Sequence, residues 1–319
     1  MYASDTSFVT LTSSGTEVAR LQLTHSNPVM KNNENRFLTY GIGGSSYEIS
    51  SFDEKLYSGT ADNKIYTADI ASNGTYCLVT EDAGYLTTLY AYSKNNNRIY
   101  KYSFSEYYIT SVAVNKDGSG CIATGISSDK GSVVTGVYVL DFSQDKAVST
   151  YTVKGDSVID CKYLTSDTAV LIGSQASYIV NKGEKNYKTV SYDGKTLSNY
   201  CFNTDTSSYT MALSRSGDGR SVALINYNKN GEVLNTINTE HKADSISVYK
   251  GTAAILDGNV VYGYNQKGDL LYSANSGTGS KKVVLASDYT AYILSVNQIR
   301  FIDLDSVSSS DTAETSTQE

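Results

Sequence analysis

The sequence contains no tryptophan, one proline and only two histidines among 319 residues. The histidines, His25 and His241, stand in no HExxH pattern, and the chain has neither a GxSxG nucleophile elbow nor a complete Walker-type phosphate loop. The sequence therefore lacks the motifs that usually carry hydrolytic and nucleotide-dependent chemistry. We expect no catalytic residues, no cofactor and no enzyme activity. Both histidines are interpreted as turn residues in contact with solvent.

Charge is also scarce. Charged residues make up only 18% of the chain, and 33 acidic against 26 basic residues give a net charge of −7. Nucleic acid is therefore an unsuitable partner, because phosphate binding requires clustered Lys and Arg. No run of about eighteen apolar residues occurs, and the N-terminus has no signal-peptide pattern. The Ser-, Thr-, Asn- and Tyr-rich composition favours an extracytoplasmic location, with membrane contact only through an anchor upstream of Met1.

The few cysteines, Cys77, Cys121, Cys161 and Cys201, follow one another at intervals of about 40 residues. No CxxC pair or other metal-ligand spacing is present, so we expect no metal site. A disulfide needs Cα atoms within about 7 Å, and equivalent positions in neighbouring repeats usually lie further apart. We predict free thiols, with Cys77 and Cys121 in the second strands of their repeats and the other two in or beside first strands.

Tyrosine, by contrast, occurs 28 times, among short apolar runs separated by Ser, Thr, Asn and Gly. This composition is typical of strands and turns. One repeat predicts four strands at residues 65–70, 76–80, 86–92 and 98–102. The next predicts three, and its first pair is joined by the hairpin turn Asp117-Gly118. A period of about 40 residues indicates the four-stranded blades of a β-propeller.

The last repeat stops after three predicted strands, at residues 282–285, 290–294 and 299–304. Two N-terminal strands, at residues 8–11 and 18–23, are available to complete it. We therefore predict an all-β fold: a β-propeller of about seven four-stranded blades, with the ring closed by N- and C-terminal strands together. Six or eight blades stay open, and a pair of β-sandwiches or a solenoid fits the period less well.

The domain boundaries follow from this repeat. Residues 1–7 are expected to be an N-terminal leader, and residues 8–304 form the propeller domain, with about 42 residues in each of seven blades. Residues 305–319 are acidic, rich in Ser and Thr, and free of apolar periodicity. We interpret them as a disordered tail.

Candidate binding residues come mainly from the tyrosines. Tyr107 and Tyr108 lie where one repeat passes to the next, and exposed tyrosines stack on sugars or anchor protein interfaces. The alternative is that they pack inside blades in place of the absent tryptophans. Asp156 is a candidate carboxylate of the central funnel, and His241 is a candidate in a loop between blades. None of the four is given a catalytic role.

Several segments together resemble a known family. They lie at residues 27–31 and 35–44, at residues 64–70 with Asn73-Gly74, and at residues 108–114 with Asp117-Gly118. They are similar to Gram-positive bacterial proteins that carry domain of unknown function 5711, a propeller of WD40- or quinoprotein-like type. The Trp-Asp signature of WD40 repeats is missing here. The resemblance implies an extracytoplasmic propeller tethered by an upstream membrane helix, and it transfers no site residues.

Three functional hypotheses follow. The first is a non-enzymatic extracytoplasmic scaffold at the cell surface, in which a rim of loops binds a protein or cell-wall partner. The alternative is a carbohydrate-binding or carbohydrate-active protein that uses the central funnel, with Asp156, Tyr107 and Tyr108 in contact with the sugar. The third is an assembly factor that pairs with extended partners along an exposed strand edge.

Overall fold

The computed structural model describes residues 1–12, 14–214, 219–296 and 298–305. The described chain consists of antiparallel strands and one short 3₁₀ helix, η1 (Thr204–Thr206). It divides into two compact units, one of residues 1–12 with 16–190 and one of residues 13–15 with 191–319. The predicted all-β class is confirmed.

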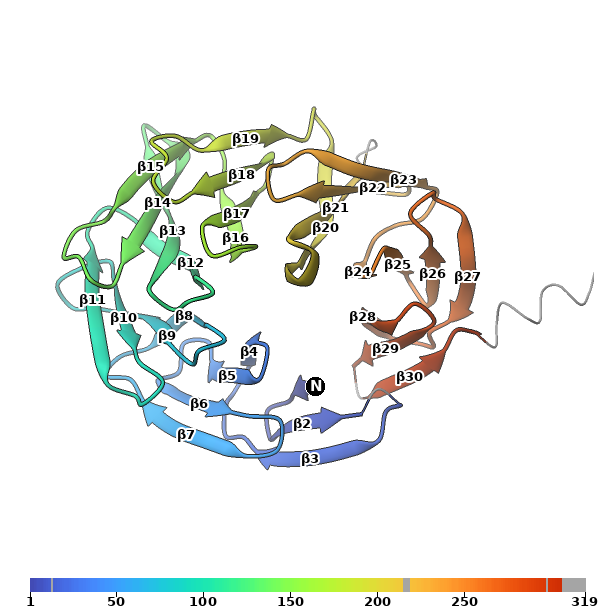
Figure 1. Ribbon diagram of the computed structural model, residues 1–319, viewed down its shortest axis with the longest axis horizontal. Helices are drawn as coiled ribbons and strands as arrows, with labels where there is room; N and C mark the ends of the chain where they lie inside the picture. The colour runs from blue at the N-terminus through green and yellow to red at the C-terminus, as the bar shows by residue number, and fades with distance from the viewer. Residues whose placement is uncertain (13, 215–218, 297, 306–319) are drawn as a thin grey trace, which may run out of the picture. The chain divides into compact units, whose positions relative to one another are not determined.

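The first unit contains five antiparallel sheets, whose strands are hydrogen-bonded in sequence order. Within it, the first strands of the second to fifth sheets lie on the inner side and their last strands on the outer side (Figure 1). The sheets are β1 (Tyr2–Ala3), β2 (Ser7–Leu11), β3 (Glu17–Gln22); β4 (Pro28–Asn33), β5 (Arg36–Gly41), β6 (Ser46–Ser50), β7 (Lys55–Thr60); β8 (Ile65–Ile70), β9 (Tyr76–Thr80), β10 (Thr87–Tyr92), β11 (Arg98–Phe104); β12 (Tyr108–Val114), β13 (Gly120–Asp129), β14 (Ser132–Asp141), β15 (Ser149–Lys154); and β16 (Val158–Tyr163), β17 (Thr168–Gly173), β18 (Ala176–Asn181), β19 (Lys188–Ser191).

The second unit contains three further sheets of the same kind, again with the strands in sequence order. Two of these sheets have four strands and the last has three. They are β20 (Thr196–Asn203), β21 (Ser208–Ser214), β22 (Val222–Asn228), β23 (Val233–Thr239); β24 (Ser245–Tyr249), β25 (Thr252–Asp257), β26 (Val260–Tyr264), β27 (Leu270–Asn275); and β28 (Ser280–Ser287), β29 (Thr290–Ser295), β30 (Ile299–Asp303).

The hairpin turns form where the sequence predicts them. Gly74 and Gly118 have φ angles of +87° and +70°, in the region that glycine enters without steric cost. The Asn73 carboxamide oxygen accepts a hydrogen bond from the Thr75 backbone N–H at 2.9 Å, which closes the first of these turns. Local turn chemistry therefore sets the register of β8 with β9 and of β12 with β13.

The core lies between neighbouring sheets. Cys77 and Leu89 of the third sheet pack with Val112 and Cys121 of the fourth, and all four are almost fully buried. The cysteines are free, as predicted, and each occupies the strand predicted for it. Burial, together with the neighbouring Cys121 thiol, raises the pKa of Cys77 well above its ordinary value. Cys77 is therefore a packing residue rather than a reactive thiol.

Two parts of the fold prediction are wrong. The structure has eight sheets rather than about seven, and no sheet of the described residues mixes N- and C-terminal strands. Instead β1–β3 form a sheet of their own, and so do β28–β30. The division by seven assumed one shared closing blade with four strands, whereas the chain makes two separate three-stranded blades. Several strands were also not predicted. One of them is β15 (Ser149–Lys154), which follows a polar stretch that gives no apolar alternation.

The two ends of the chain differ in what can be described. Tyr2 and Ala3, which fall in the predicted leader, pair with Val9 and Phe8 of β2. The predicted tail lies outside the described residues apart from Asp305. Among the described residues, no helix has the length and hydrophobicity needed to cross a membrane.

Candidate functional site

A cleft with aromatic side chains at half of its lining positions lies between β11 and the β14–β15 pair of the first unit. We call it the tyrosine cleft. Its volume is about 300 Å³, enough for one large side chain or a sugar ring. The residues that line it are Tyr102, Ser103, Phe104, Ser105, Glu106, Tyr107, Tyr138, Thr150, Tyr151 and Thr152.

Tyr138 is the centre of the aromatic cluster. Its ring centroid lies 4.9 Å from that of Phe104 in an edge-to-face arrangement, and 6.0 Å from those of Tyr102 and Tyr107. Aromatic rings at these separations attract one another beyond the gain from burial. Phe104 is buried, while the three tyrosines are half-buried and line the cleft. The cluster thus forms a firm apolar wall.

A glycine in β14 allows Tyr107 to join this wall. A Cβ atom at Gly136 would lie 2.6 Å from the Tyr107 ring, closer than real contacts allow. The ring therefore packs directly on the β14 backbone, which only a residue without a side chain permits. A glycine inside a strand often marks such a close approach.

Nine of the ten lining residues carry a polar group, namely four tyrosines, four Ser or Thr residues and Glu106. Within the described residues, the hydroxyls of Tyr102, Tyr107 and Tyr138 form no hydrogen bond and remain available to a ligand. Burial, with the Glu106 carboxylate as a further cause, raises the pKa of Tyr138 to about 12, so this phenol stays protonated at neutral pH. Glu106 is the single charged residue of the lining. The cleft combines ring faces, phenol donors and one carboxylate.

The neighbouring candidate, Tyr108, lies outside the aromatic cluster that contains Tyr107. It begins β12, pairs with Ile126 and is 53% exposed. Successive side chains of an extended chain point to opposite sides, and Tyr108 is absent from the lining of the cleft. The structure therefore brings Tyr107 together with other aromatic residues but leaves Tyr108 outside.

Asp156 lies in the loop between β15 and β16 and is 3% exposed. Its carboxylate accepts hydrogen bonds from the backbone N–H groups of Ser174 and Gln175, at 2.8 and 3.2 Å, and from the Tyr178 hydroxyl at 2.8 Å. These contacts anchor the turn between β17 and β18. Ligand binding by Asp156 stays a prediction.

His241 belongs to the second unit, in the loop between β23 and β24. Its ring stacks on Tyr262 with centroids 3.5 Å apart, and Nδ1 lies 3.6 Å from the Asp257 Oδ2 atom. The side chain is 28% exposed. Its role in binding also stays a prediction.

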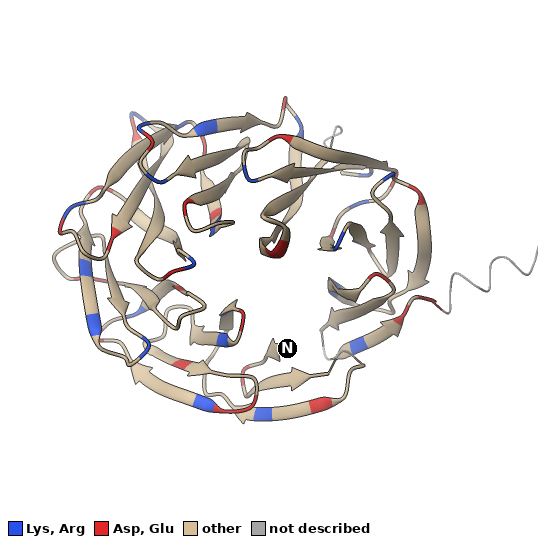
Figure 2. Cartoon of the chain, in the orientation of Figure 1, with Lys and Arg blue, Asp and Glu red and all other residues tan. Residues whose placement is uncertain are grey.

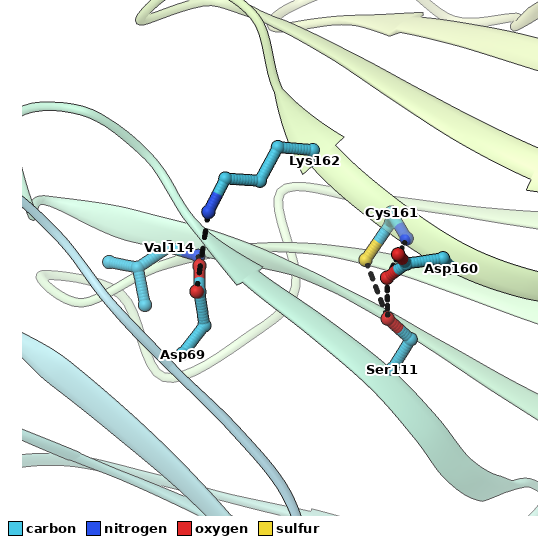
Figure 3. A network of polar contacts seen from close by, with 6 residues as sticks. All are labelled: Asp69, Ser111, Val114, Asp160, Cys161 and Lys162. Atoms are coloured by element: carbon cyan, nitrogen blue, oxygen red, sulfur yellow. Dashed lines mark hydrogen bonds and ion pairs between the residues drawn. The ribbon is translucent and has the colours of Figure 1, made fainter. Parts of the chain in front are cut away.

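Carboxylates on the inner strands are engaged in a network that crosses three sheets (Figure 3). Asp69 of β8 accepts a hydrogen bond from the Val114 N–H of β12 at 2.8 Å, and its other oxygen lies 3.4 Å from the Lys162 Nζ of β16. The Ser111 hydroxyl donates to Asp160 at 3.2 Å. These carboxylates already have partners within the protein. Their contacts link neighbouring sheets and are therefore structural.

Lys31 of β4 extends this network to a fourth sheet. Burial acts to lower its pKa, but the carboxylates of Asp160 and Asp69 outweigh burial and hold the pKa above its ordinary value. The ammonium group therefore stays charged and balances the acidic side chains. Two lysines and two aspartates neutralise one another on these inner strands.

The model of a family of unknown function, DUF5711, matches residues 1–304. The chain belongs to the DUF5711 family. In fold, the DUF5711 protein is similar to the C-terminal WD40 domain of Sif2, with a TM-score of 0.59 and 16% identity over 88% of this chain and 81% of that one. It is also similar to Hsv2 of Kluyvelomyces marxianus, with a TM-score of 0.58 and 9% identity over 86% and 91% of the two chains. None of the curated proteins matches it in sequence.

These likenesses establish the fold of the DUF5711 protein as a β-propeller of WD40 type, with eight blades of three or four strands. The propeller prediction is confirmed, although the Trp-Asp signature is missing. At this identity the likeness extends to the fold alone. The site must be argued from the side chains.

Sequence reasoning found only one wall residue of the tyrosine cleft, Tyr107. Tyr102 and Tyr138 were predicted only as strand residues, and Phe104 lay beyond the strand predicted at residues 98–102. Their convergence depends on how β11 packs against β14. A signal was present in Gly136, an isolated glycine within a predicted strand, which indicates a close approach of another group.

The reading of His25 as a solvated turn residue is wrong. His25 is 3% exposed, its Nδ1 lies 3.0 Å from the Ser46 hydroxyl, and its Nε2 lies 4.0 Å from the Glu48 Oε1 atom. Burial is the main cause that lowers its pKa; the Lys55 charge adds to this effect, and Glu48 opposes it. The DUF5711 protein therefore holds a buried neutral histidine.

This histidine predicts a pH dependence of stability. Since the pKa of His25 is lower in the folded protein than in the unfolded chain, the unfolded state binds the proton more readily. The associated stability is present above the unfolded pKa of about 6.5 and is lost as the pH falls below it. Melting temperatures of the wild type and His25→Gln, measured from pH 7.5 to 5.0, are expected to converge at low pH. A constant difference between the two proteins across this range would contradict the assignment.

Proposed function

We propose that this DUF5711 protein is a non-catalytic scaffold on the outer side of a bacterial membrane, and that its tyrosine cleft holds a side chain of a protein partner. The observation that carries the proposal is the cluster of half-buried tyrosines around Tyr138, with three hydroxyls free of internal hydrogen bonds. Tyrosines are enriched among the residues that dominate binding energy at protein interfaces, because they are large, rigid and polar at one end.

The charge of the cleft favours a basic side chain of the partner. Glu106 is its only charged lining residue, and the faces of the tyrosine rings carry partial negative charge. The chain as a whole has a net charge of −7. An arginine or lysine would stack on a ring and pair with Glu106, and complementary charge would speed association.

The distribution of charge also supports a protein partner over a polyanion. Within each unit, Lys and Arg segments alternate with Asp and Glu segments along the strands and loops (Figure 2). Binding to a phosphate backbone requires basic residues gathered on one surface. Two arguments support a location on the outer side of the membrane. One is the low-charge, hydroxyl-rich composition, and the other is the upstream membrane anchor that the family resemblance implies.

The test compares two adjacent tyrosines. The full chain, as wild type, Tyr107→Ala or Tyr108→Ala, serves as bait for cross-linked capture from the native membrane and cell-wall fraction, followed by mass spectrometry. We expect one dominant protein in the wild-type sample and at least about a thirtyfold loss of affinity for it in Tyr107→Ala, the size typical of a central interface residue. Tyr108→Ala is expected to bind nearly as the wild type does, because its side chain lies outside the cleft.

Two outcomes contradict the proposal. Equal losses in both variants would move the contact from the cleft to the surrounding surface. Recovery of wall polysaccharide without any protein would favour the carbohydrate alternative. Equal melting temperatures of the three baits serve as the control for folding.

A further inference from the structure

A second cleft of the first unit lies between the end of β3 and the β6–β7 pair. We call it the polar cleft. Its volume is about 580 Å³, and most of its lining residues carry a hydroxyl, an amide or a charge. They are Gln22, Thr24, Ser46, Tyr47, Glu48, Lys55, Tyr57, Ser58, Gly59 and Thr60.

The floor of the polar cleft holds a buried carboxylate. The Glu48 side chain is 6% exposed, and its Oε2 atom lies 2.7 Å from the Lys55 Nζ atom. Lys55 also donates to the Gln22 carbonyl oxygen at 3.2 Å, which ties β7 to β3. Within the described residues, the buried Oε2 atom of Glu48 accepts no hydrogen bond, although the Lys55 ammonium lies close to it as an ion-pair partner. Burying a carboxylate oxygen without a hydrogen bond is costly, and a ligand hydroxyl would offset this cost.

His25 adds a second unused group behind this floor. Its side chain is 1% exposed, and its Nε2 atom has no hydrogen-bond partner among the described residues. The 4.0 Å between Nε2 and the Glu48 Oε1 atom is too long for a direct hydrogen bond. Buried polar atoms nearly always have a partner. The pair is therefore incomplete in the protein alone.

One wall of the polar cleft is aromatic. Tyr57 is half-buried, and its ring centroid lies 6.1 Å from that of buried Tyr47. The Tyr47 ring rests on Gly59, where a Cβ atom would lie only 2.5 Å from it. Burial raises the pKa of Tyr47 to about 12. The Tyr57 ring is therefore a flat surface that packs against the buried Tyr47 ring.

We propose that the polar cleft binds a neutral saccharide. A sugar presents an apolar face of C–H groups, which suits Tyr57, and adjacent hydroxyls, which suit the Glu48 carboxylate and the Lys55 ammonium as acceptor and donor. Glu48 and Lys55 neutralise each other, so the cleft has no excess charge to attract an ion. A metal is not favoured either, because the described part of the chain contains no cluster of three His, Cys, Asp or Glu side chains suited to one.

This site is independent of the proposed protein contact, because it lies at different strands and uses none of the same residues. It also differs from the funnel that the sequence suggested for a carbohydrate. Asp69 of the inner strand β8 is already paired with Lys162, and Asp160 of β16 already accepts from Ser111, whereas the buried Oε2 atom of Glu48 accepts no hydrogen bond. The volume of the polar cleft suits one or two sugar rings.

The test uses the full chain and two probes, N,N′-diacetylchitobiose and cellobiose, in saturation-transfer NMR and calorimetric titrations. We expect at least one probe to bind with a dissociation constant of about 1 mM. Glu48→Gln is expected to weaken binding at least about tenfold, since a hydrogen bond to a charged acceptor is lost. Tyr57→Ala is expected to abolish the signal, and Tyr107→Ala, in the other cleft, is expected to leave it unchanged.

Thr24→Val is a second test variant that should fold normally, because Thr24 is exposed at the rim and the change keeps the side-chain volume. A weaker signal in this variant, at an unchanged melting temperature, would support the site. The absence of binding by both probes at 20-fold the expected dissociation constant would overturn the proposal, as would binding that Glu48→Gln and Tyr57→Ala leave intact. Neither result would affect capture of a protein through Tyr107.

Discussion

Replacement of Asp69 by alanine is expected to lower the free energy of unfolding by about 3 kcal/mol. The Asp69 side chain is 2% exposed, and it holds the Val114 N–H at 2.8 Å and the Lys162 ammonium at 3.4 Å. The alanine variant leaves a buried N–H group without an acceptor and a partly buried cation without a counter-charge. Both groups lie on other sheets than Asp69, so the loss loosens three sheets at once.

Urea unfolding followed by circular dichroism measures this effect. Asp62→Ala is the matched control, because Asp62 lies shortly before the same strand, is exposed, and is expected to change stability by less than about 0.5 kcal/mol. Lys162→Met should destabilise less than Asp69→Ala, since the Val114 hydrogen bond survives. Equal stability of Asp69→Ala and Asp62→Ala would show that the network does not hold the sheets together.

Replacement of Asp156 by alanine is expected to cost a similar amount, about 3 kcal/mol. Its carboxylate accepts hydrogen bonds from the backbone of Ser174 and Gln175 and from the Tyr178 hydroxyl. Several donors lose their acceptor together, and the turn between β17 and β18 loses its anchor. Tyr178→Phe removes only one of these bonds and is expected to cost about 1 kcal/mol.

The same unfolding experiment distinguishes the anchoring role of Asp156 from a binding role. If Asp156 anchors the turn, Asp156→Ala loses stability by roughly three times as much as Tyr178→Phe. If Asp156 instead served mainly a ligand, its removal would leave stability nearly unchanged or raise it, because functional carboxylates are often held at a cost to folding. That second result would refute the structural assignment.

Local signals made much of the fold predictable. The strands at residues 65–70 and 76–80 were predicted to the residue, because apolar alternation and the turn Asn73-Gly74 act over short distances. The number of blades was not predictable in the same way. It depends on whether the two ends of the chain share a sheet, and strand pairing between distant segments leaves no local mark in the sequence.

The two clefts could likewise be predicted only in part, because they form from contacts between distant segments. Tyr107 was found because it lies between two repeats. Its contact with Tyr138, and that of Tyr138 with Tyr102, arise only through the packing of one sheet on the next. His25 directly precedes a polar turn sequence, yet Ser46 and Glu48 contact it from a strand more than twenty residues away. Burial of a polar residue depends on tertiary neighbours, which composition and periodicity do not reveal.

The inner-strand network also bears on the order in which the protein is made. Asp69 finds its backbone partner 45 residues later in the chain and its lysine partner 93 residues later. A growing chain that has completed the third sheet already contains Lys31, but Asp69 gains its Val114 hydrogen bond only with the fourth sheet and its Lys162 ion pair only with the fifth. The early sheets gain their final stability only when this later strand arrives. A chain interrupted between residues 114 and 162 should consequently be an easy target for proteases.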